Sequence, residues 1–281
     1  MAFVACWVAV LWIVLTAAVF AESAGGVRVV AAYWPTRQGI STRVLVMLPK
    51  EERAGLILLP GGHGNINLSS QAQIGWGVDD FVIRTRATYA QAGFVTVVPD
   101  VATDRKPPVD LGDYRRSELQ AEDLAAIADR MRRIGEQVFV VAYDRGVTSA
   151  LNAAGRGKLE IVSSLVLISP ILERDRQTAS ILDDGARFAF GKLPVLMISH
   201  SLDKCSAAAV NHLKEIAADV TARDFQSISV TGGSDEYQLR DPLGYPRDPC
   251  NKNARHALGG LETDVSASIL DWLTKHTAAK R

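Results

Sequence analysis

The stretch Val138–Ala150 reads VFVVAYDRGVTSA and decides the fold class of this chain. It opens with the apolar run Val138–Val141, which is typical of a strand buried on both faces of a parallel sheet. The pattern breaks at Ala142–Gly146 and resumes at Val147 with small residues that favour the start of a helix. We therefore predict a strand, a five-residue turn and a helix in immediate succession.

A strand, tight turn and helix in this order have the geometry of the nucleophile elbow, usually written G-x-S-x-G. Small residues at both ends of the turn let the helix pack close to the strand. The middle residue then projects at the carboxyl end of the sheet. That residue is Asp144 here, where Ser is usual. The position predicts a nucleophile, and the residue type makes its chemistry the main question.

The composition favours one globular domain. The chain has 281 residues, of which 48% are hydrophobic, so it can bury a sizeable core. No repeat, low-complexity tract or Pro- or Gly-rich linker divides it, and we predict a single domain over residues 22–281. The formal net charge is zero, which gives no indication of nucleic acid or an anionic membrane surface as a partner.

Residues 1–21 are apolar and carry no charged side chain. The run ends in Val19-Phe20-Ala21, which predicts a signal peptide cleaved before Glu22. A retained transmembrane anchor is the alternative, since about 20 apolar residues span a bilayer. In either case we expect an exported protein, periplasmic or secreted, that contacts a membrane only if the segment is retained.

The cysteines agree with export. Cys6 falls in the N-terminal segment, which leaves Cys205 and Cys250 in the rest of the chain. An even pair of cysteines in an exported protein predicts a disulfide. Two unrelated buried thiols are the alternative, which an oxidising compartment disfavours.

Eight segments predict strands from their apolar or alternating character. They are Val27–Trp34, Thr42–Leu48, Leu56–Leu59, Phe94–Val98, Val138–Val141, Leu165–Ile168, Val195–Ile198 and Phe225–Val230. The first two make an antiparallel start, and most of the later ones are separated by helical patterns. The order predicts a doubly wound, eight-stranded, mostly parallel sheet flanked by helices.

Three further helices are expected at Ser117–Ile134, Ser206–Ala218 and Thr263–Lys275. Ser117 and Gln120 form a capping-box pattern at the start of the first, and Gly135 ends it. The last helix carries one apolar face, made by Val265, Ile269, Trp272 and Leu273.

A Gly-rich loop, Pro60–Asn65, follows the third predicted strand. Glycines let backbone N–H groups approach a substrate oxygen, as in the H-G-G-G loops of lipases and esterases. A phosphate-binding loop is excluded because no Gly-Lys-Ser/Thr follows. A plain tight turn remains the alternative.

An acid and a base follow the elbow in the chain order of the Ser-Asp-His hydrolases. Asp203 lies just past a predicted strand, where a carboxylate is well placed to orient an imidazole. His256 lies directly before the last amphipathic helix. His200 is expected to shape the turn of the acid, and His276 to be solvated.

Together these segments resemble the α/β-hydrolase superfamily across nearly all of the chain after the N-terminal segment. They are most similar to exported bacterial hydrolases of poorly defined substrate. Those proteins have a Pro-Gly-Gly loop, a Gly-Thr-Ser-Arg-Gly elbow, an acid in His-x-x-Asp-x-Cys and a Pro-Cys before the catalytic His. The matching residues here are Pro60–Gly62, Ala142–Gly146, His200–Cys205, Pro249–Cys250 and His256. The elbow keeps its Arg and last Gly but not its Ser.

The resemblance implies an α/β-hydrolase fold with one catalytic site. Its expected members are Asp144, Asp203 and His256 as catalytic residues, Gly62, His63 and Arg145 as the oxyanion hole, and Cys205 and Cys250 as a disulfide. No cofactor is expected, and no metal, because His63 and His200 lack a recognisable ligand spacing. The expected partner is a small-molecule substrate.

Asp144 changes the chemistry of the expected site. A carboxylate needs no deprotonation near pH 7, since its reference pKa is about 4. Attack on an ester carbonyl would give a mixed anhydride, whereas attack on a saturated carbon gives an alkyl ester that His256 hydrolyses by activating water. That second route resembles haloalkane dehalogenases and epoxide hydrolases, which share this fold and use Asp at the elbow.

Those families usually carry a helical cap after the sixth strand. Here only Ile171–Lys192 separates the sixth and seventh strands, so we expect no large cap domain and an open site. Three aromatic residues fall near the expected site, Trp76, Tyr89 and Tyr143, and all are expected to be packing residues.

Three functions stay open on the sequence. The first is a hydrolase acting on a small ester-like or alkyl substrate, with Asp144 as nucleophile or as a base for water. The second is a catalytically silent relative that binds a ligand in the old cleft, since fold alone does not fix function. The third is a structural or interaction protein, which no positive feature supports.

Overall fold

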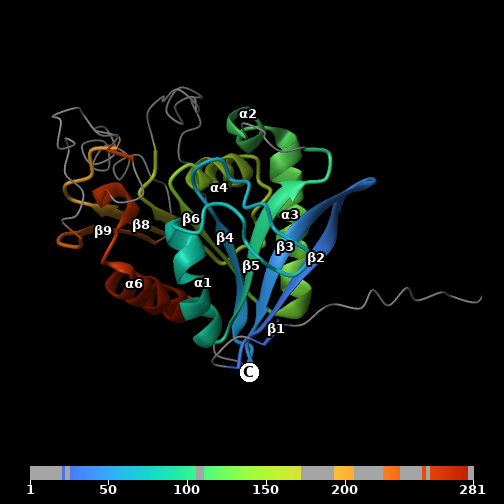
Figure 1. Cartoon of the computed structure of the whole chain (residues 1–281), viewed down its shortest axis with the longest axis horizontal. Coiled ribbons are helices and arrows are strands. Elements are labelled where there is room, and N and C mark those ends of the chain that lie inside the picture. Colours follow the sequence, from blue (N-terminus) through green and yellow to red (C-terminus); the bar gives the residue numbers. More distant parts are fainter. Residues whose placement is uncertain are drawn as a thin grey trace, which may run out of the picture.

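A computed structural model describes residues 21–22, 26–105, 111–171, 193–205, 224–234, 249–250 and 254–277. Within these ranges the strands form one nine-stranded sheet in the order β1-β2-β3-β5-β4-β6-β7-β8-β9. Figure 1 shows the sheet running through the molecule with helices on both sides. The order is that of a doubly wound α/β fold, as predicted.

The strands are β1 (Ala21–Glu22), β2 (Arg28–Arg37), β3 (Ile40–Leu48), β4 (Ala54–Leu59), β5 (Phe94–Ala102), β6 (Val138–Tyr143), β7 (Ser164–Ile168), β8 (Val195–His200) and β9 (Phe225–Val230). The pairs β1–β2, β2–β3 and β3–β5 are antiparallel, and the pair β4–β5 is parallel. Every pair from β4 to β9 is parallel. All eight predicted strands are present, and the two-residue β1 was not predicted.

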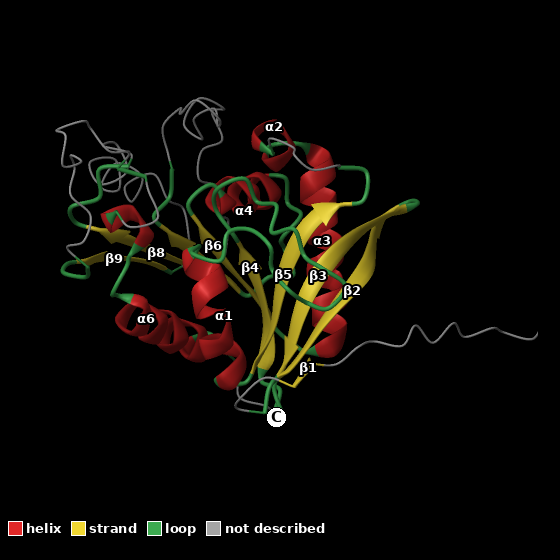
Figure 2. Cartoon of the chain, viewed as in Figure 1, coloured by secondary structure: helices red, strands yellow, loops and turns green. Residues whose placement is uncertain are grey.

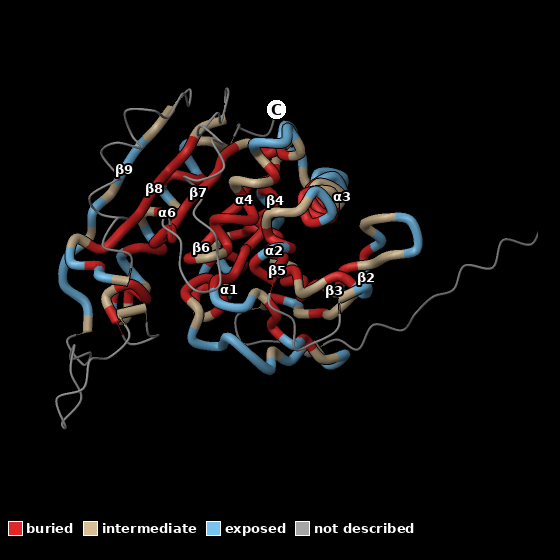
Figure 3. Tube along the Cα trace, turned by 90° about the horizontal axis from the view of Figure 1, so that it is seen from above, coloured by how far each residue is buried: buried red, intermediate tan, exposed pale blue. Residues whose placement is uncertain are grey.

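The central strands are buried along their whole length. Every residue of β4, β6, β7 and β8 is buried, whereas β9 at the sheet edge is partly exposed. Figure 3 shows this gradient from the middle of the sheet to its edge. Parallel strands need cover on both faces, which is why these segments are continuous apolar runs in the sequence.

The described helices are α1 (Phe81–Gln91), α2 (Gly112–Arg115), α3 (Glu118–Ile134), α4 (Gly146–Gly155) and α6 (Glu262–Lys275), with a 3₁₀ helix at Arg255–Ala257. Helices α3, α4 and α6 lie where the sequence predicted helices, and α1 and α2 were not predicted. The helix expected at Ser206–Ala218 lies outside the described residues.

The two faces of the sheet carry separate apolar cores. Helices α3 and α4 pack on one face, and α1 and α6 on the other. Figure 2 shows these helices in red on either side of the yellow sheet. The predicted apolar face of α6 is buried, and the Trp272 Nε1–H donates to Ser164 Oγ at 2.6 Å. This packing fixes the start of α6, and with it the loop that carries His256.

The start of α3 follows only half of the predicted capping box. Ser117 Oγ accepts a hydrogen bond from the Gln120 N–H at 3.2 Å. The Gln120 side chain does not complete the box, because its Oε1 has no hydrogen-bond partner among the described residues. Gly135 lies at the C-cap, as predicted.

The N-terminal prediction lies largely outside the described residues, which begin at Ala21. Among the helices that the structure describes, none has the length and apolar character needed to cross a bilayer. The sequence predicted that a short connection, Ile171–Lys192, stands where related proteins carry a cap. Residues 172–192 of that connection also lie outside the described part.

Candidate active site

The elbow turn is strained at its tip. Asp144 has a φ of 52°, in the left-handed region, between the end of β6 and the start of α4. That conformation costs on the order of 1–2 kcal/mol for most side chains, although Asp and Asn tolerate it. Backbone hydrogen bonds hold the turn, from the Asp144 N–H to the Ile168 oxygen at 2.9 Å and from the Val147 N–H to the Asp144 oxygen at 3.1 Å.

Close backbone contact explains the glycine after the tip. A Cβ on Gly146 would lie 2.2 Å from the carbonyl oxygen of Leu59 at the end of β4. No side chain fits there without moving β4 or α4. The elbow is therefore locked against β4, and the position of Asp144 is fixed relative to the loop that follows β4.

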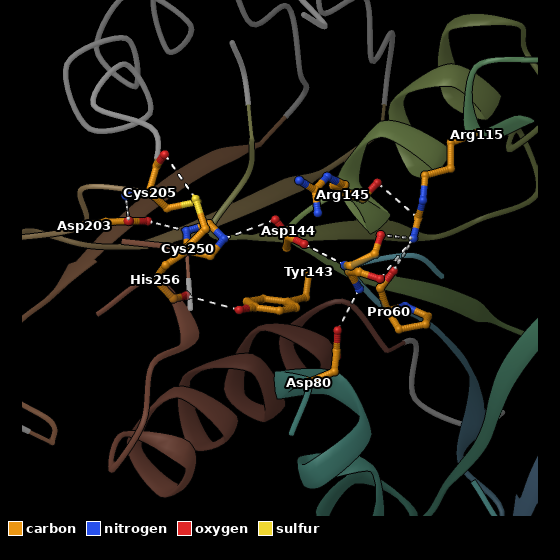
Figure 4. Close-up of polar contacts among 12 residues, drawn as sticks. Pro60, Asp80, Arg115, Tyr143, Asp144, Arg145, Asp203, Cys205, Cys250 and His256 are labelled. Atoms are coloured by element: carbon orange, nitrogen blue, oxygen red, sulfur yellow. Dashed lines mark hydrogen bonds and ion pairs between the residues drawn. A yellow bond between two sulfur atoms is a disulfide. The ribbon is translucent and has the colours of Figure 1, made fainter. Parts of the chain in front are cut away.

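We call Pro60–Gly64 the oxyanion loop. A Cβ on Gly61 would lie 2.4 Å from Asp144 Oδ2, so position 61 has to be glycine for the aspartate to fit. The Gly62 N–H donates to Asp144 Oδ2 at 2.7 Å, and the Gly61 N–H donates to Asp80 Oδ2 at 2.7 Å. Figure 4 shows the two carboxylates that accept these hydrogen bonds, Asp80 and Asp144. The N–H of Gly62 thus meets a carboxylate oxygen of the protein itself.

The predicted acid and base lie in line with Asp144. Asp203 Oδ2 lies 2.7 Å from His256 Nδ1, and His256 Nε2 lies 3.2 Å from Asp144 Oδ1 (Figure 4). All three side chains are buried. The other oxygen of Asp203 accepts the Cys205 N–H at 2.8 Å, which fixes the carboxylate plane. The structure therefore brings together the three residues that the sequence singled out.

His200 shapes the turn of the acid, as expected. Its Nδ1 accepts the Leu202 N–H at 3.0 Å, its Nε2 contacts the Gly232 oxygen at 3.0 Å, and its own backbone oxygen accepts the Asp203 N–H at 3.0 Å. These three contacts hold the His200 ring and the turn that carries Asp203 in one arrangement.

The two carboxylates determine the charge of His256. Burial alone would lower its pKa, but the hydrogen bonds and charges of Asp144 and Asp203 outweigh burial and raise that pKa to about 10. For Asp144, burial alone would raise the pKa, but the contact with His256, helped by the Gly62 N–H and the Arg145 charge, lowers it to about 2. At neutral pH the site therefore holds an aspartate–imidazolium pair.

Tyr143 packs beside His256. Its ring lies 5.8 Å from the His256 ring and 6.2 Å from that of Phe81, centroid to centroid. Its hydroxyl donates to the backbone oxygen of His256 at 3.4 Å. Burial, and then the neighbouring carboxylates, raise the pKa of Tyr143 well above its usual value, so it stays neutral. Tyr143 and the fully buried Tyr89 pack in the interior, as expected.

Cys205 and Cys250 form the predicted disulfide. The bridge joins the turn of Asp203 to the segment that precedes His256, across 45 residues of sequence. The bridge therefore links the segments of the predicted acid and the predicted base covalently.

A cavity of about 620 Å³ opens beside Asp144. Its wall includes the oxyanion loop, Trp76, Asp79, Asp80, Tyr143, Asp144, Arg145 and Cys250. Trp76 is 46% exposed and lines this cavity, so the expectation that it is a packing residue is wrong. The backbone of its loop is held against Ile66, because the backbone N–H of Trp76 donates to the Ile66 oxygen at 3.1 Å. The indole thus lies on the cavity wall.

The other predicted oxyanion-hole residues also line this cavity. His63 is an exposed residue of the oxyanion loop, and Arg145 lies between the elbow tip and α4. In the part of the chain that the structure describes, no group of three or more His, Cys, Asp or Glu side chains is placed to hold a metal ion.

Two residues of the site were not predicted from the sequence. Asp80 caps α1 by accepting the N–H groups of Val82 and Ile83, and its other oxygen holds the Gly61 N–H. Burial raises its pKa to about 7, against the effect of the Gly61 hydrogen bond. An Asp before an apolar run is a helix-start pattern that could have located it. The second residue, Arg115, lies behind the oxyanion loop, and no sequence pattern around it indicates this position.

The comparisons with known proteins rest on structure. No protein-family model matches the sequence, and a search among curated proteins finds no match. Dienelactone hydrolase from Anabaena variabilis aligns over 90% of this chain and 100% of its own, at 15% identity and a TM-score of 0.61. An esterase from Pyrococcus furiosus aligns over 89% and 92%, at 10% identity and 0.61. Proline iminopeptidase from Mycobacterium smegmatis aligns over 88% and 98%, at 11% identity and 0.59.

These similarities cover most of the chain at low sequence identity, so they bear on the fold rather than on the reaction. The observed sheet, mostly parallel and flanked by helices, agrees with them. The chain has the α/β-hydrolase fold.

Proposed function

We propose that the chain is a hydrolase in which the Asp144 carboxylate displaces a leaving group from a saturated carbon of a small substrate. One observation carries the proposal. The Gly62 N–H holds Oδ2 of Asp144, whereas the other oxygen, Oδ1, faces His256. The two oxygens are therefore differentiated, as required when one attacks and the other becomes a carbonyl oxygen.

In the first step Oδ1 of the Asp144 carboxylate forms a bond to the substrate carbon. The bond from that carbon to the leaving group breaks, and the leaving group departs with the electron pair. The product is an alkyl ester of Asp144, with Oδ2 as its carbonyl oxygen. Asp144 enters the step already ionised, because its pKa is lowered to about 2.

In the second step water attacks Cγ of the ester, and the alcohol leaves. Esterification removes the negative charge of Asp144, which is one of the two charges that raise the pKa of His256. That pKa therefore falls in the ester, and His256 can lose its proton and then take one from water. The Gly62 N–H remains on Oδ2, where the negative charge of the tetrahedral intermediate develops.

The overall reaction converts the substrate and one water into an alcohol, the leaving group and a proton. Acyl transfer from an ester fits Asp144 less well, because carboxylate attack on a carbonyl gives a mixed anhydride. The proposed substrate therefore carries its leaving group on an alkyl carbon. The exposed Trp76 indole on the cavity wall favours an apolar substituent on that substrate.

A second candidate is ligand binding without turnover. Two observations favour it. First, the opposite charges of Asp144 and His256 already offset each other in their contact. Second, His256 is buried and is not among the described residues that line the cavity. A site in this state binds small molecules in the cavity but needs His256 or water to move before it hydrolyses an ester.

Isotope labelling separates the two candidates. The purified protein is incubated in H₂¹⁸O with a panel of haloalkanes, epoxides and p-nitrophenyl esters. Because water attacks Cγ of Asp144, repeated turnover places ¹⁸O in the Asp144 carboxylate, which peptide mass spectrometry detects. A His256→Gln variant should accumulate the alkyl ester at Asp144. Turnover with no label at Asp144 rejects the nucleophile role, and binding without turnover selects the second candidate.

We also propose that the protein works outside the cytoplasm. The apolar N-terminal segment and the Cys205–Cys250 disulfide both support export. Fractionation of cells that produce the full chain, with the N-terminus of the exported form determined, tests this. A protein that starts at Met1 and remains in the cytoplasm would contradict it.

A further inference from the structure

A buried guanidinium lies behind the oxyanion loop. Arg115 is the last residue of α2 and is 5% exposed. Its Nη2 donates to three consecutive carbonyl oxygens of the loop, those of Pro60 at 3.0 Å, Gly61 at 3.1 Å and Gly62 at 3.4 Å. Its Nη1 donates to the carbonyl oxygen of Arg145 and to Ser149 Oγ, both at 3.1 Å. One side chain thus contacts both the loop and the elbow (Figure 4).

The direction of these carbonyl groups fixes the direction of the N–H groups. In a planar trans peptide the C=O and the following N–H point in opposite directions. With the carbonyls of Pro60 and Gly61 turned toward Arg115, the N–H groups of Gly61 and Gly62 point away from it. They do so in the structure, since they donate to Asp80 and Asp144.

We infer that Arg115 is a positioning residue that sets the peptide planes of the oxyanion loop relative to the elbow. The guanidinium suits this role because its N–H donors lie in one rigid plane and reach two backbone segments at once. A lysine ammonium at this position would keep the charge but act as a single point donor on a flexible stem.

The loop sequence accommodates the guanidinium. Gly64 has a φ of 71°, and a Cβ on it would lie 2.4 Å from Nη2 of Arg115. Gly61 gives the same close approach on the opposite side, to Asp144. The loop is therefore held between a buried cation and the elbow carboxylate, and its glycines are required at both contacts.

The test uses Arg115→Lys and two readouts that need no substrate, so it does not depend on the proposed hydrolysis. The first readout is amide hydrogen exchange of Gly61 and Gly62 by NMR. The second is the ring N–H resonance of His256, which reports on the Asp144 carboxylate beside it. In Arg115→Lys we expect the amide exchange rates of Gly61 and Gly62 to rise roughly tenfold or more, because the loop opens locally. We also expect the ring N–H resonance of His256 to shift.

Arg37→Lys is the matched control. Arg37 is a second largely buried guanidinium, but it pairs with Asp104 and Asp123 instead of the loop. This variant should lose stability without changing exchange at Gly61 and Gly62 relative to other amides. Unchanged loop exchange in Arg115→Lys, or equal acceleration in Arg37→Lys, overturns the inference.

A wild-type measurement decides the question if Arg115→Lys does not fold. A guanidinium held at both ends cannot rotate freely, so its Nη1 and Nη2 protons should give separate NMR signals. One averaged signal for the Arg115 Nη protons contradicts the inference, and resolved signals with slow exchange support it.

Discussion

Oδ1 of Asp144 lies 3.2 Å from Nε2 of His256, and both side chains are buried. A serine at the elbow would offer this nitrogen a hydroxyl proton to accept. Here the partner is a carboxylate, and the imidazole keeps its own proton because two negative groups surround it. Any change at position 144 should therefore alter the protonation of His256.

Replacing Asp144 with Ser should create a conventional serine site. Removal of the carboxylate lowers the pKa of His256, so that the imidazole can take the serine proton. We expect hydrolysis of p-nitrophenyl acetate to rise on the order of 100-fold over wild type, and a fluorophosphonate probe to label residue 144. Activity assays and peptide mass spectrometry check both.

The matched control is the double variant Asp144→Ser/His256→Gln, which should lose the gain. A folded Asp144→Ser protein that neither labels nor hydrolyses would show that the cleft lacks more than a serine. Labelling of a different serine in wild type would place the elbow elsewhere.

Asp203→Asn should slow any turnover by roughly 10³–10⁴-fold, by analogy with the same change in serine proteases. An Asn side chain can still accept the Cys205 N–H, so the turn should survive. It no longer stabilises the imidazolium through Nδ1, and the pKa of His256 should fall. An NMR titration of His256 and a thermal melt separate the catalytic effect from misfolding; an unchanged rate would remove Asp203 from the site.

The ion pair makes stability depend on pH in a defined window. The pKa of Asp144 is depressed to about 2, so its contribution is present above the unfolded value near 4 and is lost as pH falls toward 2. The pKa of His256 is raised to about 10, so its contribution is complete below about 6.5 and is lost as pH rises through 10. The contribution of this pair to the Tm should therefore fall below pH 4 and again above pH 6.5.

His256→Gln should flatten the alkaline limb of this profile.

Asp80 adds a separate pH dependence, because its pKa is raised to about 7 and the protonated form stabilises the fold. Asp80→Asn should therefore reduce the decline of Tm between about pH 4 and 7. A variant profile parallel to that of wild type would show that the replaced group does not control that limb.

Loss of the disulfide should destabilise the whole chain and loosen the site. Closing a loop across 45 residues stabilises the folded state by about 3–4 kcal/mol in the entropic model. Cys205→Ser and Cys250→Ser should each lower the Tm, and the double variant should lower it no further. Peptide mapping without reductant checks the bridge, and two freely alkylated thiols in the native protein would contradict it.

Trp76 should report ligand binding by fluorescence. In a chain lacking residues 1–21 it is the accessible tryptophan, because Trp34 and Trp272 are 4% and 3% exposed. Acrylamide should quench Trp76, and a substrate in the cavity should protect it. Trp76→Ala should raise KM by roughly tenfold through lost apolar contact, whereas Trp76→Phe should change it less. Equal KM for both variants and wild type would exclude Trp76 from the binding surface.

The sequence predicted what depends on local pattern. Buried strands are continuous apolar runs, and the elbow is a tight turn between such a run and small residues, so both were located within a few residues. Helix α1 was missed because Val82, Ile83, Thr85 and Thr88 are β-branched and lower helix propensity. Packing against α6 and the Asp80 cap outweigh that preference.

The missing parts of the site depend on contacts between distant segments. Arg115 contacts the oxyanion loop more than 50 positions earlier in the chain, and no residue pattern around it indicates this. The exposure of Trp76 depends on how its loop folds back onto Ile66. The order of elbow, acid and base, in contrast, is a property of the linear chain, which is why the sequence could bring Asp144, Asp203 and His256 together.

The left-handed backbone at residue 144 also bears on which residues can replace the aspartate. Aspartate and serine codons are not connected by a single nucleotide change, and the routes between them pass through asparagine or glycine, among other residues. Both of these intermediates tolerate a positive φ better than most side chains. The turn conformation therefore stays accessible at every step of such a route. A lineage can exchange the residue at the tip while inheriting the surrounding scaffold unchanged.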